Sequence, residues 1–331
     1  MNSAVWLTWE RQRRNASMAS LLGVEYCELI SNKSRLLRYC GLIKRTFGLL
    51  RAKRPKLIFY QNPSIVLSIV VVLYKILSLR EVVIVGDYHN GGLFPPKGAA
   101  IVPFLIRHTN LVLVSNDNLV ETIHRWGGEG VAFPDPLPDI VYAGPGESNA
   151  RPQVLFICSW ADDEPINEVI NAGMTLPEVD VLITGKVRLD RCPAAGNITD
   201  NIKLTGFLPE ADFERLLGGV DLIMDLTTRD DCMVCGAYEA VSVGKPVILS
   251  DNPVSKRYFE RGVLFTNNTS TDIALKIADG LKRISELEQE VGELREKLRH
   301  DDLVRADKLA ETLDVRLVLR KGMSSVNNPD C

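Results

Sequence analysis

The fold of the chain is decided by one stretch in its second half. Residues 236–248 read Gly-Ala-Tyr-Glu-Ala-Val-Ser-Val-Gly-Lys-Pro-Val-Ile. An apolar helical segment ends at Gly244, and a Lys-Pro pair turns the chain into a β-branched run, as where a helix leads into the next strand of a parallel sheet. We expect the helix to start near Cys232 or Met233, so that its free N–H groups suit a phosphate. Glu239, one and a half to two turns further on, is then placed to accept hydrogen bonds from two adjacent ribose hydroxyls.

The same alternation of short β-branched runs and amphipathic stretches extends outward from this segment. The predicted strands of the second half are Val154–Cys158, Val179–Thr184, Ile202–Leu204, Leu222–Asp225 and Pro246–Leu249. Those of the first half are Ala4–Thr8, Leu57–Tyr60, Val82–Val85 and Leu111–Val114, with helices at Asn15–Leu22, Ser34–Leu50 and Ser64–Leu77. This pattern predicts an α/β protein of two doubly wound domains in tandem, whose ligands bind beyond the carboxyl ends of the strands.

A stretch rich in Pro, Gly and Asp, from Phe133 to Pro152, separates the two halves. We predict an N-terminal domain over 1–140, a linker over 141–152, a second domain over 153–300, a helical segment over 301–321 and a disordered tail over 322–331. Apolar residues spaced by three and four predict a helix packed on the body rather than a dimer zipper: Ile284, Leu287, Val291, Leu294 and Leu298. A homo-oligomer is therefore not indicated.

Composition and charge fit a two-domain globular protein with a basic first part. The chain has 331 residues, of which 46% are hydrophobic and 24% charged, which excludes disorder, collagen and coiled-coil rods as whole-chain descriptions. Residues 1–107 hold 16 Lys and Arg against 5 Asp and Glu, and the remainder holds 23 against 37. A basic half can face nucleic acid, an anionic lipid surface or a phosphorylated substrate, and charge alone does not choose among them. Nucleic acid is the weaker idea, because no aromatic interleaving or binding module accompanies the charges.

The sequence shows no targeting signal and no membrane span. Met1–Arg14 passes from a short apolar stretch straight into a polar, basic one. Ile65–Leu79 is broken by Lys75 and is shorter than the ~20 residues of a spanning helix, so we expect a buried helix there, with shallow bilayer contact as the alternative. Seven irregularly spaced cysteines favour a reducing compartment, and the lone Cys232-x-x-Cys235 has no second pair, so no metal site is predicted. We expect a cytoplasmic protein.

Three segments of the second half resemble the donor domain of GT-B glycosyltransferases, most closely the family 4-like group. They are Leu204–Pro209, Asp221–Asp231 and Gly236–Ile248. The resemblance implies two Rossmann-like domains facing across a cleft, with Asp231 contacting the donor sugar and Glu239 the nucleotide ribose. It also implies that the backbone of Gly206-Phe207-Leu208 holds the base.

The loop after the first strand of the second domain departs from that family. Family 4 enzymes carry an Arg and a Lys there, whereas this chain reads Ser159-Trp160-Ala161-Asp162-Asp163-Glu164. A Ser-Trp pair followed by acids resembles the β-mannosyltransferases that act on dolichol-linked chitobiose. We expect Lys186 and Arg229 to neutralise the donor diphosphate instead. The expected donor-binding residues are Ser159, Trp160, Gly185, Lys186, Gly206, Phe207, Leu208, Thr228, Arg229, Asp231, Cys232, Met233 and Glu239.

Two strand ends of the first half resemble the same mannosyltransferases. They read Tyr60-Gln61-Asn62-Pro63 and Gly86-Asp87-Tyr88-His89-Asn90. His89 is a candidate to bind a donor sugar hydroxyl or phosphate, and the candidate catalytic residues, including a base for an inverting reaction, are Asp87, Glu10 and His89. The expected acceptor-binding residues are Arg11, Arg13, Arg14, Asn62 and Asn90, because arginine pairs with phosphate through two hydrogen bonds.

These features together predict a metal-independent hexosyltransferase that needs no cofactor. It takes a nucleotide sugar, GDP-mannose as the first expectation and a UDP-sugar as the other, and a lipid-diphosphate-linked or polysaccharide-precursor acceptor. The expected place of work is the anionic inner membrane face, with the protein bound peripherally. Two alternatives stay open: a nucleotide-sugar 2-epimerase of the same fold, and a degenerate GT-B partner subunit, suggested by the missing Arg and Lys.

Overall fold

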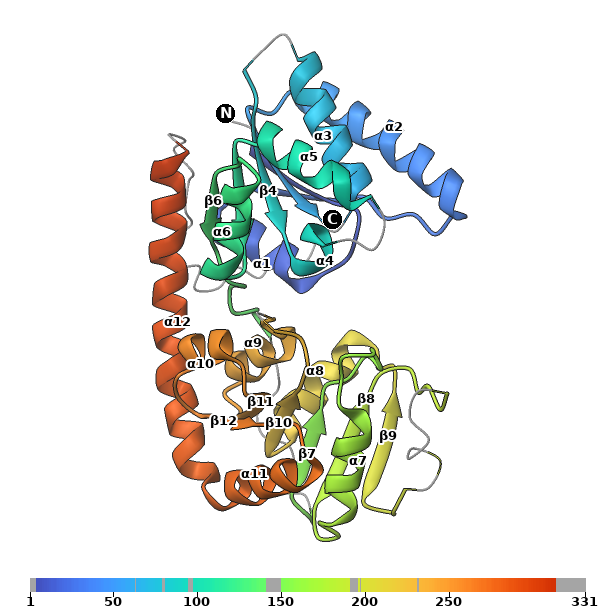
Figure 1. Cartoon of the computed structure of the whole chain (residues 1–331), viewed down its shortest axis with the longest axis vertical. Helices are drawn as coiled ribbons and strands as arrows, with labels where there is room; N and C mark the ends of the chain where they lie inside the picture. The colour runs from blue at the N-terminus through green and yellow to red at the C-terminus, as the bar shows by residue number, and fades with distance from the viewer. Residues whose placement is uncertain are drawn as a thin grey trace, which may run out of the picture. The chain divides into compact units, whose positions relative to one another are not determined.

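The computed structural model describes residues 4–62, 64–78, 81–94, 98–140, 150–190, 196, 198–230 and 232–313. The chain divides into two compact units (Figure 1). Unit 1 runs up to Pro136 and resumes at Asp301, and unit 2 runs from Leu137 to His300.

Unit 1 is a parallel sheet of six strands in the order β2-β1-β3-β4-β5-β6. The strands are β1 (Ala4–Thr8), β2 (Glu25–Glu28), β3 (Leu57–Asn62), β4 (Val83–Tyr88), β5 (Leu111–Val114) and β6 (Gly130–Ala132). The helices are α1 (Arg13–Leu21), α2 (Arg35–Lys53), α3 (Ile65–Leu77), α4 (Asn90–Leu93), α5 (Val102–His108) and α6 (Asp117–Arg125), with a 3-10 turn at Ala99–Ile101. Strands such as β5, which reads Leu-Val-Leu-Val and is fully buried, are apolar on both faces because helices cover both sides of the sheet.

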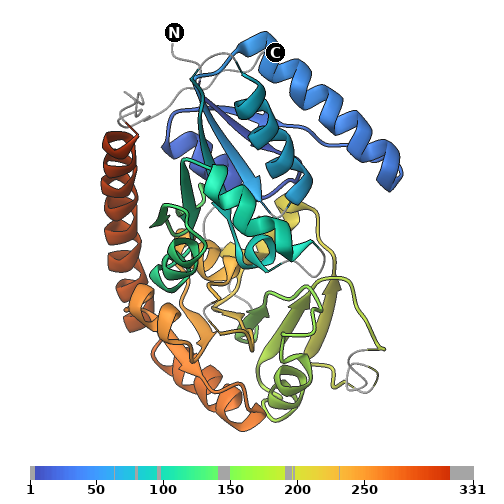
Figure 2. The same cartoon turned by 45° about the horizontal axis from the view of Figure 1, so that its top comes forward.

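Alternate residues of the unit 1 strands build two cores. Leu7 and Ile58 face one side, where residues of α2, α3 and α5 pack on them. Trp6 and Phe59 face the other side and stack with ring centroids 5.4 Å apart. Helices α2 and α3 lie side by side on unit 1 in both views (Figures 1 and 2).

Unit 2 repeats the arrangement with the strand order β12-β11-β10-β7-β8-β9. Its strands are β7 (Gln153–Phe156), β8 (Asp180–Thr184), β9 (Ile202–Gly206), β10 (Leu222–Asp225), β11 (Val247–Ser250) and β12 (Val263–Thr266). Its helices are α7 (Ile166–Met174), α8 (Glu210–Gly219), α9 (Cys235–Ser242), α10 (Pro253–Tyr258), α11 (Ser270–Lys282) and the first part of α12 (Ile284–Thr312). One core lies between the sheet and α7 and α11, and the other between the sheet and α8, α9 and α12.

The predicted packing of the C-terminal helix is confirmed. Leu287, Val291, Leu294 and Leu298 of α12 are buried in the core of unit 2, and Ala306 and Leu309 of the same helix are buried in a core of unit 1. The helix is thus continuous through residue 300, where the sequence suggested a separate segment.

The predicted strands are all present, with ends that shift by at most three residues. The strands that the sequence did not predict are β2, β6 and β12, each of three or four residues and each at a sheet edge. Edge strands bury little surface, so the hydrophobic alternation that identifies a strand is weak in them.

Helix α3 corrects the expectation of a buried helix. Leu67 and Val70–Val72 are buried, but Leu73, Ile76 and Leu77 are exposed because only one face of the helix meets the sheet. Within the described residues, no helix combines the length and apolar character of a membrane span. The predicted tail over 322–331 and most of the linker over 141–152 lie outside the described residues.

Candidate functional site

The strand orders place one topological switch point in each unit. In unit 1 the order reverses between β1 and β3, and in unit 2 between β7 and β10. Ligands of open parallel sheets bind at such points, beyond the carboxyl ends of the two strands. The loops to examine are therefore those that follow β1, β3, β7 and β10.

Glu164 shapes the loop after β7. Its carboxylate accepts hydrogen bonds from the backbone N–H groups of Ser159, at 3.0 Å, and Ala161, at 2.7 Å, and from the Ser159 hydroxyl at 2.9 Å. Glu164 lies in the loop where family 4 glycosyltransferases carry an Arg and a Lys, and its hydrogen bonds fix the conformation of that loop.

Trp160 and Gly185 are structural residues of this loop. Trp160 has a positive φ of 64° and a buried side chain, whose Nε1 donates to the Thr184 carbonyl at 2.9 Å. A Cβ at Gly185, where φ is +90°, would lie 2.2 Å from the Cys158 carbonyl oxygen. The expectation that the Trp160 side chain contacts a donor is corrected, because that side chain fills the core of unit 2.

Asp163 joins the two loops of the unit 2 switch point. Its carboxylate accepts from the Thr227 hydroxyl at 2.7 Å and forms a 2.8 Å ion pair with Arg229, whose side chain remains more than half exposed. Its backbone carbonyl accepts from the Thr228 N–H at 2.7 Å. The loops after β7 and β10 are therefore fixed to each other.

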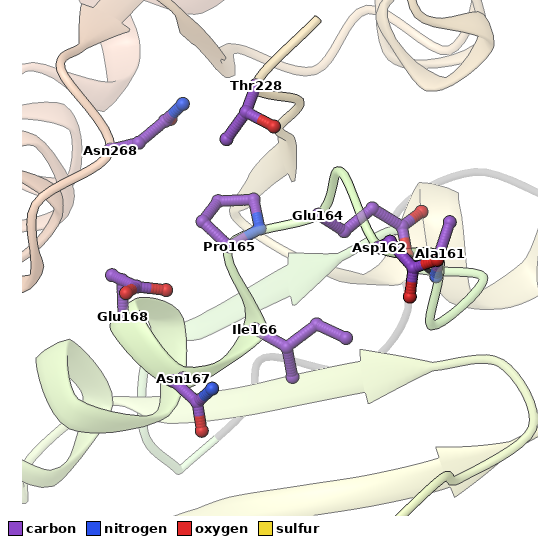
Figure 3. Close-up of a pocket in the computed structure, with 9 residues that line it drawn as sticks. All are labelled: Ala161, Asp162, Glu164, Pro165, Ile166, Asn167, Glu168, Thr228 and Asn268. Carbon is purple, nitrogen blue, oxygen red and sulfur yellow. Dashed lines mark hydrogen bonds between the residues drawn. The ribbon is translucent and has the colours of Figure 1, made fainter. Parts of the chain in front are cut away.

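A pocket of about 440 Å³ opens beside these two loops (Figure 3). It is lined by Ala161, Asp162, Glu164, Pro165, Ile166, Asn167, Glu168, Thr228 and Asn268. Thr228 and Asn268 face it from one side, and Asn167 and Glu168 come from the first turn of α7 (Figure 3). The lining carries three carboxylates and no cation, so positive charge for a diphosphate has to come from outside this lining.

Four further donor-site candidates lie at or just after the ends of β8 and β9. Gly206 has a φ of +72°, a conformation that favours glycine, and its carbonyl accepts from the Gly185 N–H at 3.0 Å. The side chain of Phe207 is 85% exposed and Leu208 is half-buried. Lys186 is exposed and makes no ion pair in the described part of the chain.

Helix α9 brings Glu239 close to a buried acid. Glu239 lies in the second turn and is 9% exposed. Asp225, which ends β10, accepts from the Gly236 N–H at 2.7 Å, and a Cβ at Gly236 would lie 2.5 Å from the same carboxylate oxygen. Burial raises the pKa of Asp225 well above its usual value, and the nearby charges of Glu239 and Glu164 raise it further.

The start of α9 differs from the sequence expectation. The helix begins at Cys235, because Val234 is extended and Asn252 Nδ2 holds the preceding loop through the carbonyl of Cys232 at 3.3 Å. Cys232 and Met233 are half-buried residues of that loop. Asp231 lies outside the described residues.

A buried polar network fixes the switch-point loop of unit 1. Thr8 Oγ1 lies 2.8 Å from both Gln61 Oε1 and the carbonyl of Glu10. Asn15 Nδ2 donates to Gln61 Oε1 at 2.8 Å, and Trp6 Nε1 donates to Asn15 Oδ1 at 2.9 Å. Glu10, on the fixed loop, is exposed to solvent.

Arg14 is not an accessible phosphate ligand, which corrects the expectation. Its side chain is 3% exposed and contacts both oxygens of Asp87, at 2.6 and 2.9 Å, and Asp135 at 2.6 Å. Burial raises the pKa of Asp87, but the charges of Arg14 and His89 outweigh that effect and hold it well below its usual value. Asp87 therefore anchors Arg14 through both of its carboxylate oxygens.

His89 lies beside this pair at the end of β4. Its Nε2 is 3.3 Å from Asp87 Oδ2, although the two are not aligned for a hydrogen bond, and its side chain is partly exposed. Asn62 is fully buried, so its side chain is not open to an acceptor. Its backbone carbonyl oxygen lies 3.5 Å from the backbone nitrogen of His89. The side chain of Asn90 lies outside the described residues.

Because Arg14 is buried, it does not form an accessible cluster with Arg11 and Arg13, the other two arginines expected to bind an acceptor. Arg11 is exposed and pairs with Glu28 at 3.2 Å, and Arg13 is half-exposed. Asp135 and Glu164 organise these loops, although neither is among the site residues expected from the sequence. Nothing local marks Asp135, which meets the side chain of Arg14 121 positions away. The partners of Glu164 lie in its own loop, only three to five residues away.

Comparison with solved structures identifies the architecture. HepE from Anabaena, in complex with UDP-glucose, matches with a TM-score of 0.72 at 14% identity over 94% of this chain and 99% of HepE. Sucrose-phosphate synthase from Thermosynechococcus elongatus matches with a TM-score of 0.67 at 14% identity, over 87% of this chain and 81% of that one. The chain has a glycosyltransferase-like GT-B fold.

A third GT-B structure belongs to another enzyme class. A putative UDP-N-acetylglucosamine 2-epimerase from Listeria monocytogenes matches with a TM-score of 0.58 at 10% identity, over 95% of this chain and 97% of that one. No sequence-family model matches the chain, and no curated protein is similar to it in sequence. Identities this low establish the fold alone. Among the described residues, no group of His, Cys, Asp and Glu side chains gathers as a metal site requires.

Proposed function

We propose that the protein is a glycosyltransferase that moves a hexose from a nucleotide sugar to a lipid-linked or polysaccharide-precursor acceptor at the cytoplasmic membrane face. The observation that carries the proposal is the switch point of unit 2, where two interlocked loops, a pocket and the acid-bearing helix α9 adjoin. The match to a UDP-glucose complex over nearly the whole of both chains supports this assignment.

In unit 2 each candidate residue has a proposed role. Glu239 accepts hydrogen bonds from the ribose, and the exposed Phe207 with the Gly206 backbone borders the base. Arg229 and Lys186 neutralise the diphosphate, with Ser159, Thr228, Cys232 and Met233 around it. Because a departing nucleoside diphosphate gains charge, cations held at its oxygens stabilise the transition state without a metal. Asp231 is proposed to contact the sugar.

In unit 1 we propose His89 and Glu10 as the residues that act on the reacting groups. Asp87 and Arg14 hold the strand end that carries His89. Glu10 is the exposed carboxylate of the fixed switch-point loop and is the candidate base. Arg11 and Arg13 remain the candidate contacts for an acceptor phosphate.

The second candidate function is a nucleotide-sugar 2-epimerase, favoured by the match to the Listeria protein. The two activities differ in their products. An epimerase converts the nucleotide sugar without any acceptor, whereas a transferase releases a nucleoside diphosphate and modifies the acceptor. A degenerate subunit would bind nucleotide sugars weakly or not at all.

A calorimetric screen of GDP-, UDP- and dTDP-sugars tests the proposal. We expect one nucleotide series to bind. The sequence resemblance to mannosyltransferases favours GDP-mannose, and the structural match to a UDP-glucose complex favours UDP-glucose. The sugar is then analysed by NMR after incubation without acceptor. Binding with an unchanged sugar supports a transferase, an epimerised sugar supports the second candidate, and no binding contradicts both enzymes.

A further inference from the structure

The beginning of helix α2 exposes leucines that the candidate site does not use. Leu36 and Leu37, in its first turn, are 76% and 62% exposed, and Ile30 in the preceding loop is also exposed. Arg45 Nη1 donates to the Ile30 carbonyl at 2.9 Å, which ties that loop to the helix. Large apolar side chains at one end of a helix, held in place and open to solvent, indicate a contact with another surface.

The same helix presents cations without any acid among them. From Leu29 to Arg80 the sequence contains no Asp or Glu. Arg35, Lys44 and Arg51 of α2 are exposed and make no ion pair in the part of the chain that the structure describes. Leu37, Lys44 and Arg51 are seven residues apart, about two helical turns, so they lie along one outer face.

The two acids that most closely precede α2 in the sequence are already paired. Glu25 forms an ion pair with Lys53 at 2.7 Å, and Glu28 pairs with Arg11 at 3.2 Å. The exposed cations of α2 therefore keep their charge for a partner outside the chain.

The topology places the start of α2 at the edge of the sheet where the strands have their carboxyl ends. Helix α2 connects the parallel strands β2 and β3, so it runs back against them and begins at their carboxyl ends. The loop that carries Glu10 follows β1 at that same edge. The exposed leucines and the unit 1 switch point thus share one edge of unit 1.

We propose that Ile30, Leu36 and Leu37, with the cations Lys44 and Arg51, form a docking surface for an anionic lipid bilayer. The leucines enter the boundary between headgroups and acyl chains, and the cations contact anionic headgroups, because one signal alone gives only weak attachment. The inference rests on the proposed function, because it names the surface through which a glycosyltransferase would meet a lipid-linked acceptor. It replaces the Arg11, Arg13 and Arg14 cluster, which the burial of Arg14 breaks up.

Charge argues against a second copy on this surface. Two copies of α2 packed symmetrically would bring their unpaired cations together, which is unfavourable. The bilayer supplies a continuous negative surface and an apolar layer in one partner.

Co-sedimentation of the full chain with vesicles tests the inference. We expect binding to phosphatidylcholine mixed with phosphatidylglycerol, weaker binding at high salt, and none to phosphatidylcholine alone. Leu36→Ser with Leu37→Ser should lower the affinity at least about tenfold. Lys44→Gln and Arg51→Gln should each lower the affinity about fivefold.

Ile76→Ser with Leu77→Ser is the matched control. These two residues are an exposed apolar pair at the C-terminal end of α3, which lies at the opposite edge of the sheet from the start of α2. The control should bind vesicles like the unchanged protein. The inference is overturned if mixed vesicles do not bind, if neutral vesicles bind equally, or if only the control variant loses binding. It is also overturned if sedimentation finds an oligomer that the Leu36 and Leu37 changes dissociate while vesicle binding is unaffected.

Calorimetry on the same variants separates this inference from the proposed function. The α2 changes should leave nucleotide-sugar affinity as it was. Vesicle binding without nucleotide-sugar binding would contradict the proposed function and leave the docking surface intact. Nucleotide-sugar binding without vesicle binding would contradict the docking surface and leave the proposed function intact.

Discussion

At the residue scale, the donor assignment depends most on Glu239. If this carboxylate holds the ribose, Glu239→Ala should weaken nucleotide binding by several-fold to about a hundredfold, because a hydrogen bond to a charged group is worth roughly 1.5–3 kcal/mol. Titration calorimetry with the nucleoside diphosphate measures the change.

Glu239→Gln is the control, since it keeps the shape of a side chain that is nearly buried in α9 and removes only its charge. Thermal unfolding of both variants shows that the fold is retained. A nucleoside diphosphate affinity that is the same in all three proteins would remove Glu239 from the site.

His89 is the residue whose role differs most from simple binding. Its partly exposed ring lies beside the buried Asp87 and Arg14 pair, at the end of β4. His89→Ala should lower kcat strongly and spare nucleotide affinity, as expected for an interaction made mainly in the transition state.

His124→Ala is the matched change for that experiment, because His124 is an exposed residue of α6, away from the strand ends. It should leave kcat unchanged. Full activity of His89→Ala would make His89 a structural residue of the β4 end.

Single residues were predicted well where the signal is local and badly where it is not. The glycine turn at Gly244, with a φ of +75°, follows from the sequence around it. The burial of Arg14 and of Trp160 does not, because it depends on Asp135 and on the Thr184 carbonyl, which are far away in the chain.

At the element scale, the junction of β10 and α9 makes stability depend on pH. Burial raises the pKa of Asp225 in the folded protein, so the folded state holds a proton that the unfolded state loses above about pH 4. The stabilisation is fully present below the unfolded pKa and is lost as pH rises toward the folded one. Asp225→Asn should therefore gain stability relative to the unchanged protein as pH increases from 5 to 8.

Urea unfolding at a series of pH values checks this, with Asp307→Asn, an exposed change in α12, as the control. The asparagine keeps an acceptor for the Gly236 N–H. Parallel stability curves for Asp225→Asn and the unchanged protein would show that the carboxyl does not titrate differently on folding.

Elements were predictable in proportion to their burial. Central strands such as β5 and β10 have the predicted bounds, because apolar runs covered on both faces are legible in sequence. The edge strands β2, β6 and β12 were missed, and the start of α9 was misplaced because the Asn252 side chain, beyond β11, holds its preceding loop.

At the scale of the whole molecule, two tandem doubly wound units were predictable and the proposed docking surface was not. Alternating strands and helices and a Pro-rich break indicate such a fold directly. The charge excess of the first part was also predictable from the sequence. Only the structure shows that Arg14 is buried and that Arg11 is paired with Glu28, whereas Lys44 and Arg51 of α2 are exposed.

The central claim is that the protein transfers a hexose, and the most direct test is transfer itself. The full chain is incubated with the nucleotide sugar that binds and with lipid-diphosphate-linked saccharides in mixed anionic vesicles, and the lipid fraction is analysed by mass spectrometry. We predict an acceptor longer by one hexose, an equal amount of released nucleoside diphosphate, and loss of both with Glu239→Ala. Nucleotide-sugar binding without extension of any such acceptor, or conversion of the sugar in the absence of acceptor, would contradict the account.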